Sequence, residues 1–171
     1  MSVLSFRRAT AADVPALVPL IERAYFGTPG DRSWTHEADM FEGPRTSLAE
    51  ISRLVANSAY FIVAERDGVL RGCAVVKRQD ADIYFGMFAV APDEQGKGTG
   101  RAIIAEVERY GREVGAPRVM IEVVNVRPEL VGFYERGGFV QTGQILPFPF
   151  EEDPSAANIP GIALIEMEKR L

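Results

Sequence analysis

The stretch APDEQGKGTG, residues 91–100, places three glycines at alternate positions, directly after the apolar run MFAV. Glycines spaced in this way let a backbone approach a phosphate closely, because no side chain stands between them. The dinucleotide fingerprint G-x-G-x-x-G fails, since Arg101 lies three residues after Gly98, and the P-loop fails because Gly-Lys is followed by glycine rather than Ser or Thr. What remains is Gln95-x-x-Gly98-x-Gly100 at a junction between a strand and a helix. Such a junction predicts an anion site, and the alternative is a tight turn that only allows close packing of helix on sheet.

The patterns on either side of this stretch alternate between strand and helix. Strand patterns are LSFRR (4–8), AYFIVAE (59–65), VLRGCAVVK (69–77), DIYFGMFAV (82–90), RVMIEVV (118–124), FVQTGQIL (139–146) and IALIEMEKRL (162–171). The second and third are joined by Asp67-Gly68, a hairpin signal. RVMIEVV is nearly all apolar, which predicts a strand buried on both faces.

Four helices are expected between these strands. Thr10 and Ser47 each begin a capping box, and Pro15 and Pro19 predict that the first helix is kinked or starts late. The second helix is expected to end near residue 56, the third at Gly115, and the fourth over 128–136. The order β-α-α-β-β-β-α-β-α-β-β predicts antiparallel meanders around one right-handed β-α-β crossover, in an α/β sandwich on a mixed sheet. No repeat or linker divides the chain, so we expect one domain over 1–171.

The composition narrows the function classes. A formal charge of −5 argues against nucleic acid as a partner, and the apolar runs are too short for a membrane span. No signal peptide is evident, and the single cysteine fits a reducing compartment, so a cytoplasmic location is expected. One histidine and one cysteine make a protein-built zinc site improbable, so no metal is expected.

Val90–Gly100, the helix and apolar strand that follow, and FYERGGF (133–139) together resemble the GNAT superfamily of acyl-CoA-dependent N-acyltransferases. The specific resemblance covers residues 87–140. It implies a mostly antiparallel sheet of about seven strands with one central parallel β-α-β splay. It also implies that acetyl-CoA is the cofactor, its pyrophosphate on the loop 95–100 and its pantetheine arm on the opened strand edge.

The resemblance implies roles for particular residues. Those assigned to acetyl-CoA are Phe88, Val90, Gln95, Gly96, Lys97, Gly98, Thr99, Gly100, Asn125 and Phe133. Asn125 has an alternative role in capping the helix at 128–136. Tyr134 occupies the family's general-acid position, where it would protonate the CoA sulfur; the alternative is a tyrosine that only packs beside Phe133.

The base for the amine is less determined. Glu122 is the expected catalytic base, with Asp82, Tyr84 or a water chain as alternatives, and periodicity does not show which face of its strand meets the cleft. The residues expected around the acceptor are Tyr25, Phe26, Trp34, His36 and Tyr84, with a surface role as the alternative for His36. Cys73 is expected to be a buried core thiol.

We therefore expect an N-acetyltransferase that moves an acetyl group directly from acetyl-CoA to the primary amine of a small molecule. The loops 27–46 and 145–161, which carry aromatic residues, favour a closed pocket. A protein or peptide N-acetyltransferase and a non-catalytic acyl-CoA sensor are the alternatives. A homodimer is the default symmetric assembly.

Overall fold

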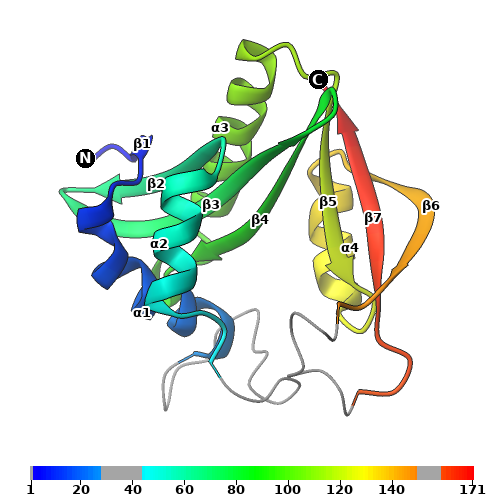
Figure 1. Ribbon diagram of the computed structural model, residues 1–171, viewed down its shortest axis with the longest axis horizontal. Helices are drawn as coiled ribbons and strands as arrows, with labels where there is room; N and C mark the ends of the chain where they lie inside the picture. Colours follow the sequence, from blue (N-terminus) through cyan, green and yellow to red (C-terminus); the bar gives the residue numbers. More distant parts are fainter. Residues whose placement is uncertain (1, 28–43, 150–158) are drawn as a thin grey trace.

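The computed structural model describes residues 2–27, 44–149 and 159–171 of the chain. They form one seven-stranded sheet in the order β1-β2-β3-β4-β5-β7-β6, in which only β4 and β5 are parallel (Figure 1). The strands are β1 Ser5–Arg8, β2 Tyr60–Arg66, β3 Val69–Gln79, β4 Asp82–Val90, β5 Arg118–Val124, β6 Val140–Pro147 and β7 Ala163–Arg170. The helices are α1 Val14–Phe26, α2 Leu48–Asn57, α3 Thr99–Glu113 and α4 Pro128–Arg136. The expected element order and mixed sheet are confirmed.

Most of the local signals in the sequence act as expected, but the second capping box forms only in part, because the Glu50 carboxylate accepts from the Thr46 hydroxyl at 2.8 Å and α2 is capped by Ser47 alone. Thr10 and Asp13 form a capping box around a 3-10 turn, and α1 starts only at Val14 with Pro19 inside it. The hydroxyl of Ser47 accepts a hydrogen bond from the Glu50 N–H at 3.1 Å, which caps α2. Asp67 and Gly68 both have positive φ, as a type I′ hairpin turn requires.

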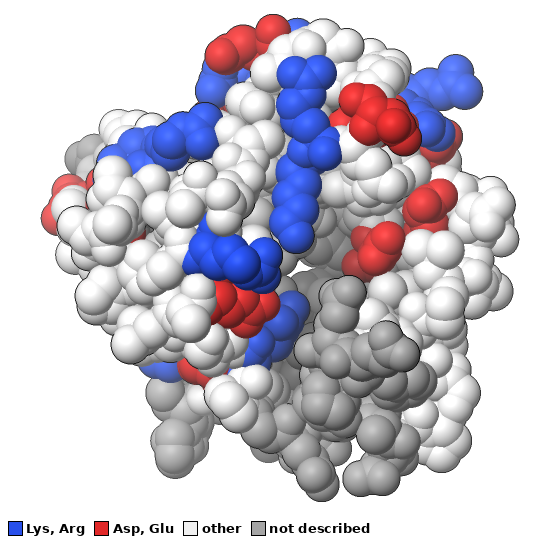
Figure 2. Space-filling view, viewed as in Figure 1, with Lys and Arg blue, Asp and Glu red and all other residues white. Residues whose placement is uncertain are grey.

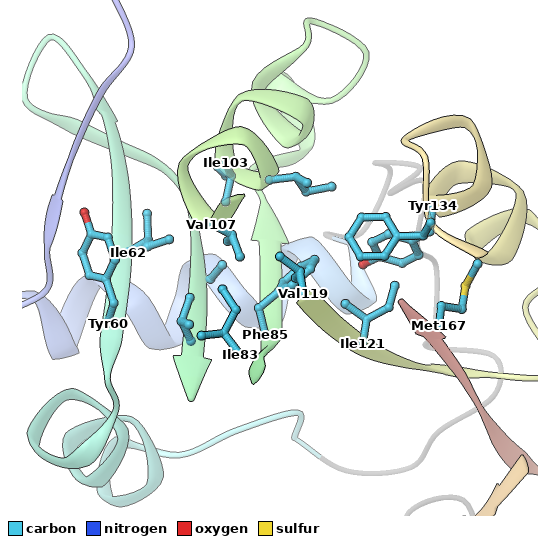
Figure 3. Packing of buried hydrophobic residues seen from close by; sticks show 14 of the residues in the cluster. Tyr60, Ile62, Ile83, Phe85, Ile103, Val107, Val119, Ile121, Tyr134 and Met167 are labelled. Carbon is cyan, nitrogen blue, oxygen red and sulfur yellow. The ribbon is translucent and has the colours of Figure 1, made fainter. Parts of the chain in front are cut away.

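Helices cover both faces of the sheet. α1 and α2 pack on one face, over a core that includes Leu17, Ile21, Phe61 and Val75. α3 and α4 pack on the other face, where the larger core gathers around Ile83, Ile103, Val107 and Val119 (Figure 3). The sheet is therefore the middle layer of an α/β sandwich, and any opening in it lies between two helical layers.

The expectation that β5 is buried on both faces is wrong at one position. Val119, Ile121 and Val123 point into the larger core, while Glu122 on the opposite face is exposed. Although its sequence is nearly all apolar, β5 has one face in the core and one face that is partly open. The polar residue at the centre of the strand marks the open face.

β4 contains a bulge that changes which residues face which layer. Cys73 pairs with Ala89 and Val75 with Gly86, so two residues of β4 lie opposite Ala74. Met87, the first of these, has φ 47. The extra residue turns Phe88 toward the core under α3 and α4, the face that also receives Phe85.

No described helix is long and apolar enough to cross a membrane. Trp34 and His36, expected around the acceptor, lie outside the described residues. The acidic run Glu151-Glu152-Asp153 lies outside them too, and the sequence predicts for it either a lid that selects a cationic acceptor or a solvated charge run.

Candidate active site

The two parallel strands separate soon after they meet. In the described chain β4 and β5 pair only at Ile83↔Val119 and Tyr84↔Met120. Beyond these pairs the strands diverge, and Figure 1 shows them open like a V. The expected splay is confirmed, and it leaves the edges of β4 from Phe85 and of β5 from Ile121 unpaired with each other.

The glycine loop stands in front of α3. Gly96 and Gly98 have φ 78 and 85, a left-handed conformation that side chains other than glycine's rarely adopt. A Cβ at Gly98 would meet nothing within 4 Å, so the space before the helix is open. The N–H groups of the first turn have no partner within the helix, and its dipole favours an anion there.

Gly100 has a different reason to be glycine. A Cβ there would lie 3.3 Å from Phe88 Cζ and 3.8 Å from Phe133 Cζ. Phe88 and Phe133 stack with 6.3 Å between ring centroids, beneath the start of α3. At Gly100, therefore, the contacts with Phe88 and Phe133 agree with the alternative interpretation, in which a glycine allows the helix to pack closely on the sheet.

A first cleft of about 420 Å³ lies between the splay and the glycine loop. The residues assigned to acetyl-CoA that line it are Phe88, Val90, Gln95, Gly96, Gly98, Gly100 and Phe133. Arg101 and Arg136 also line it and were missed by the sequence analysis. Arg101 directly follows the glycine stretch, in the first turn of α3, and Arg136 belongs to the motif FYERGGF, two residues after Tyr134. Their cations suit an anionic ligand.

Thr99, Lys97 and Asn125 do not line this cleft. Thr99 is buried, and its hydroxyl donates to Glu94 Oε2 at 2.9 Å. The Asn125 amide donates to the Gly161 carbonyl at 3.0 Å and accepts from the Ala163 N–H at 3.0 Å. The alternative cap role of Asn125 is wrong, because α4 has no side-chain cap. The cofactor roles of these three residues stay predictions.

Glu94 anchors the glycine loop from beneath. Its carboxylate is 4% exposed and accepts from Thr99 and, at 3.4 Å, from Arg66 Nη2. Arg71 Nε lies 3.9 Å from the other carboxylate oxygen. A buried charge with these partners ties the first residue of α3 to β2 and β3.

A second cleft of about 360 Å³ lies on the face of α1 and α2. It is lined by Tyr25, Phe26, Pro44, Arg45, Glu50, Phe85, Gly86, Met87, Phe88, Ile121, Glu122, Val123, Val124, Leu130, Tyr134, Phe148, Pro149 and Leu164. The expected acceptor residues Tyr25 and Phe26 are in its wall, and so is Phe148, which packs with Ile162. Tyr84 lines neither cleft.

The two clefts meet at four residues, which line both: Tyr25, Phe88, Leu130 and Tyr134. Tyr134 is 9% exposed and lies among Phe85, Phe88, Phe133 and Phe139, with ring centroids 5.2 to 6.5 Å from its own. Burial, and to a smaller extent Tyr25, raises the pKa of Tyr134 above its ordinary value of 10. Its hydroxyl therefore carries a proton at neutral pH, and it forms no hydrogen bond within the described part of the chain.

Glu122 lines the second cleft together with Tyr134, which settles the face that periodicity left open. In register it lies opposite Glu166 of β7. Partial burial, and then the charge of Glu166, raises the pKa of Glu122. Burial, followed by the charges of Glu166, Asp82 and Glu122, also raises the pKa of Tyr84, so Tyr84 lies close to this acidic pair.

Cys73 is fully buried, as expected. Burial raises its pKa to about 12, so the thiol is protonated and unreactive at neutral pH. No group of three or more His, Cys, Asp or Glu side chains is gathered as a metal site within 2–27, 44–149 and 159–171.

The splayed sheet, the glycine loop and the two joined clefts define the N-acetyltransferase class of α/β folds. The sequence model of the Acetyltransferase (GNAT) family matches residues 20–139, and the chain belongs to this family.

Individual relatives agree with this placement. Streptothricin acetyltransferase from Streptomyces lavendulae is 33% identical over 90 residues, 52% of this chain and 48% of that one. The chain thus aligns with about half the length of this relative. PaiA N-acetyltransferase from Thermoplasma acidophilum, solved in complex with coenzyme A, has a TM-score of 0.76 at 15% identity over 99% of both chains.

A second solved structure is similar over nearly the whole chain. The ribosomal-protein-S18-alanine N-acetyltransferase of Escherichia coli has a TM-score of 0.71 at 17% identity, over 98% of this chain and 94% of that one. At such identities the likeness of both structures establishes the fold alone.

Proposed function

We propose that this protein is an acetyl-CoA-dependent N-acetyltransferase that acts on the primary amine of a small molecule by direct transfer. The observation that carries the proposal is the position of Tyr134, a protonated and buried phenol where the two clefts meet. The first cleft is lined by the glycine loop and suits acetyl-CoA, and the second cleft is lined by the Glu122 carboxylate and suits the amine.

The residues present fit acetyl-CoA. The open space before Gly98, its positive φ, and the cations of Arg101 and Arg136 suit a diphosphate. The unpaired edge of β4 beyond Tyr84 suits the amide groups of a pantetheine arm. When bound, acetyl-CoA supplies the acetyl group as a thioester whose departing sulfur takes up one proton.

The chain's own residues supply the proton chemistry. The Tyr134 hydroxyl holds the proton needed at the junction of the clefts, because burial disfavours its ionised form. Glu122 takes a proton from the ammonium of the acceptor, and its raised pKa makes it a better base than a glutamate of ordinary pKa. Direct transfer agrees with the burial of Cys73, the one cysteine of the chain.

Thermal unfolding in the presence of acetyl-CoA, CoA, ATP or NAD tests the cofactor. A ligand at about 100 times its Kd adds about 2.7 kcal/mol of stability, which raises the Tm of a domain of this size by several degrees. We expect a rise with both CoA forms and none with ATP or NAD. Thiol release with a panel of amines then tests transfer, and no rise with either CoA form would refute the proposal.

A further inference from the structure

The face of the sheet beyond the splay carries a pair of carboxylates that the proposed reaction uses only in part. Glu122 of β5 and Glu166 of β7 are direct antiparallel partners. Residues opposite each other in this way lie on the same face, with Cβ atoms about 5 Å apart. Figure 2 shows acidic side chains on this half of the molecule, over β5, β7 and β6.

The next carboxylates along this face are neutralised, but this pair is not. Arg118 binds Asp82 at 2.6 Å and also Glu168, two residues from Glu166. In the described chain no cation pairs with Glu122, and the one side chain that binds the Glu166 carboxylate is neutral, the Thr142 hydroxyl at 2.9 Å. Two like charges directly opposite each other destabilise a sheet, so a bound cation would relieve a cost that the free protein carries.

The pair of Glu122 and Glu166 adjoins the second cleft, and the Tyr134 hydroxyl in that cleft is a second feature that points to a ligand. Glu122 and Tyr134 line the same cleft, and Tyr134 is nine-tenths buried with an unpartnered hydroxyl. In the described part of the chain, the inaccessible side-chain N and O atoms that lack a hydrogen-bond partner are Ser58 Oγ and Arg71 Nε. The Tyr134 hydroxyl is not among them, so it is accessible from the cleft. The cleft extends to β7 through Leu164, two residues from Glu166.

Among the described residues, the opposite wall of this cleft carries one carboxylate, Glu50, and one cation, Arg45. Glu50 accepts from the Thr46 hydroxyl at 2.8 Å, and the Arg45 guanidinium lies over the Tyr25 ring, 4.7 Å from its centroid. Within the described residues, three carboxylates therefore lie in or beside this cleft, those of Glu50, Glu122 and Glu166, against the one guanidinium of Arg45.

We propose that Glu166 is a subsite for a second ammonium group, and that the acceptor is a small diamine or polyamine. The reacting amino group lies near Tyr134 and gives its proton to Glu122, and the carboxylate of Glu166, one strand further on, binds the other ammonium. The spacing of two cross-strand carboxylates matches the distance between the ends of a short diamine. This inference rests on the proposed function for the reacting amine, but the subsite can be tested by binding alone.

The test compares three four-carbon ligands that differ in one end group: diaminobutane, butylamine and γ-aminobutyrate. Each is titrated calorimetrically into the full chain, alone and saturated with CoA. We expect diaminobutane to bind about tenfold tighter than butylamine, and γ-aminobutyrate to bind more weakly than either. Equal affinities for the two amines, or no measurable binding of any of the three, would overturn the subsite.

Two variants locate the effect. Glu166→Gln is expected to bring the affinity ratio of diaminobutane to butylamine close to one. Glu168→Gln is the matched control, since it removes a carboxylate on the same strand and face whose charge Arg118 already neutralises. That variant should preserve the ratio, and a ratio unchanged in Glu166→Gln would contradict the assignment.

Thiol release separates this inference from the proposed function. Acetylation of butylamine and diaminobutane with equal kcat/KM, and equal binding, would remove the subsite and leave the transferase. Selective binding of diaminobutane that depends on Glu166, without thiol release from any amine, would remove the transferase and leave the subsite.

Discussion

Tyr134 of α4 and Phe88 of β4 lie 6.5 Å apart between ring centroids, and both line both clefts. Phe88 faces Tyr134 only because the bulge at Met87 shifts the alternation of β4 by one residue. A phenol is thus held by aromatic packing at the place where the two clefts meet. This relationship leads to the first prediction.

Removing the Tyr134 hydroxyl should separate catalysis from binding. Tyr134→Phe keeps the ring packing and is expected to lower kcat by about 100-fold, since general acid catalysis typically contributes that much. The affinity for CoA, measured calorimetrically, should not change. Tyr110→Phe is the control, because Tyr110 packs on Tyr60 and lines neither cleft. If Tyr134→Phe turns over as fast as the unmodified protein, Tyr134 is not the general acid. If neither protein shows turnover while both bind CoA, a non-catalytic acyl-CoA sensor is favoured.

Gly98 and Gly68 form a matched pair for testing whether the glycine loop binds the cofactor. Both have positive φ, 85 and 74, and a Cβ at either would meet nothing within 4 Å. Valine at either position should therefore cost about 1–2 kcal/mol of unfolding free energy through backbone strain alone. Gly98→Val is also expected to abolish the Tm rise with CoA, while Gly68→Val should keep it. Normal CoA binding by a folded Gly98→Val protein would remove the loop from the cofactor site.

The buried carboxylate of Glu94 should matter more than an exposed one. Glu94→Gln leaves Arg66 and Arg71 without their shared anion, so we expect a loss of about 1–3 kcal/mol in urea unfolding. CoA affinity should also fall, because Thr99 at the start of α3 is tied to this carboxylate. Glu113→Gln, an exposed partner of Arg109 at the other end of α3, should cost under about 1 kcal/mol. Equal losses in the two variants would show that Glu94 does not anchor the loop.

The pKa of Glu122 should respond to its cross-strand partner. Partial burial and the charge of Glu166 raise this pKa, so the carboxyl stays protonated to a higher pH than a glutamate of ordinary pKa. Glu166→Gln removes the repulsion and should move the midpoint to lower pH. Carbon-13 NMR titration of the glutamate carboxyl groups measures this shift. The signal of Glu122 is identified as the one that is absent from the spectrum of Glu122→Gln. A midpoint that is the same with and without Glu166 would show that the two side chains do not face each other.

Much of the fold was predictable because its signals are local. The Thr10 capping box, the Ser47 cap, the Asp67-Gly68 turn and the glycine loop act over three or four residues, so each could be recognised in the sequence and each occurs in the structure. The prediction for β5 failed at Glu122, because an apolar run does not reveal whether a helix covers both faces of its strand.

The sequence by itself determined the order of the elements, the glycine loop before α3 and the place of Tyr134 in α4. Tertiary structure alone decided that the two clefts meet at Tyr134 and that Glu122 lies opposite Glu166. A two-residue period shows which side chains of one strand share a face, but not which strand lies beside it or in what register. Strand pairing and the splay depend on packing between segments far apart in the chain, and the site is built at that level.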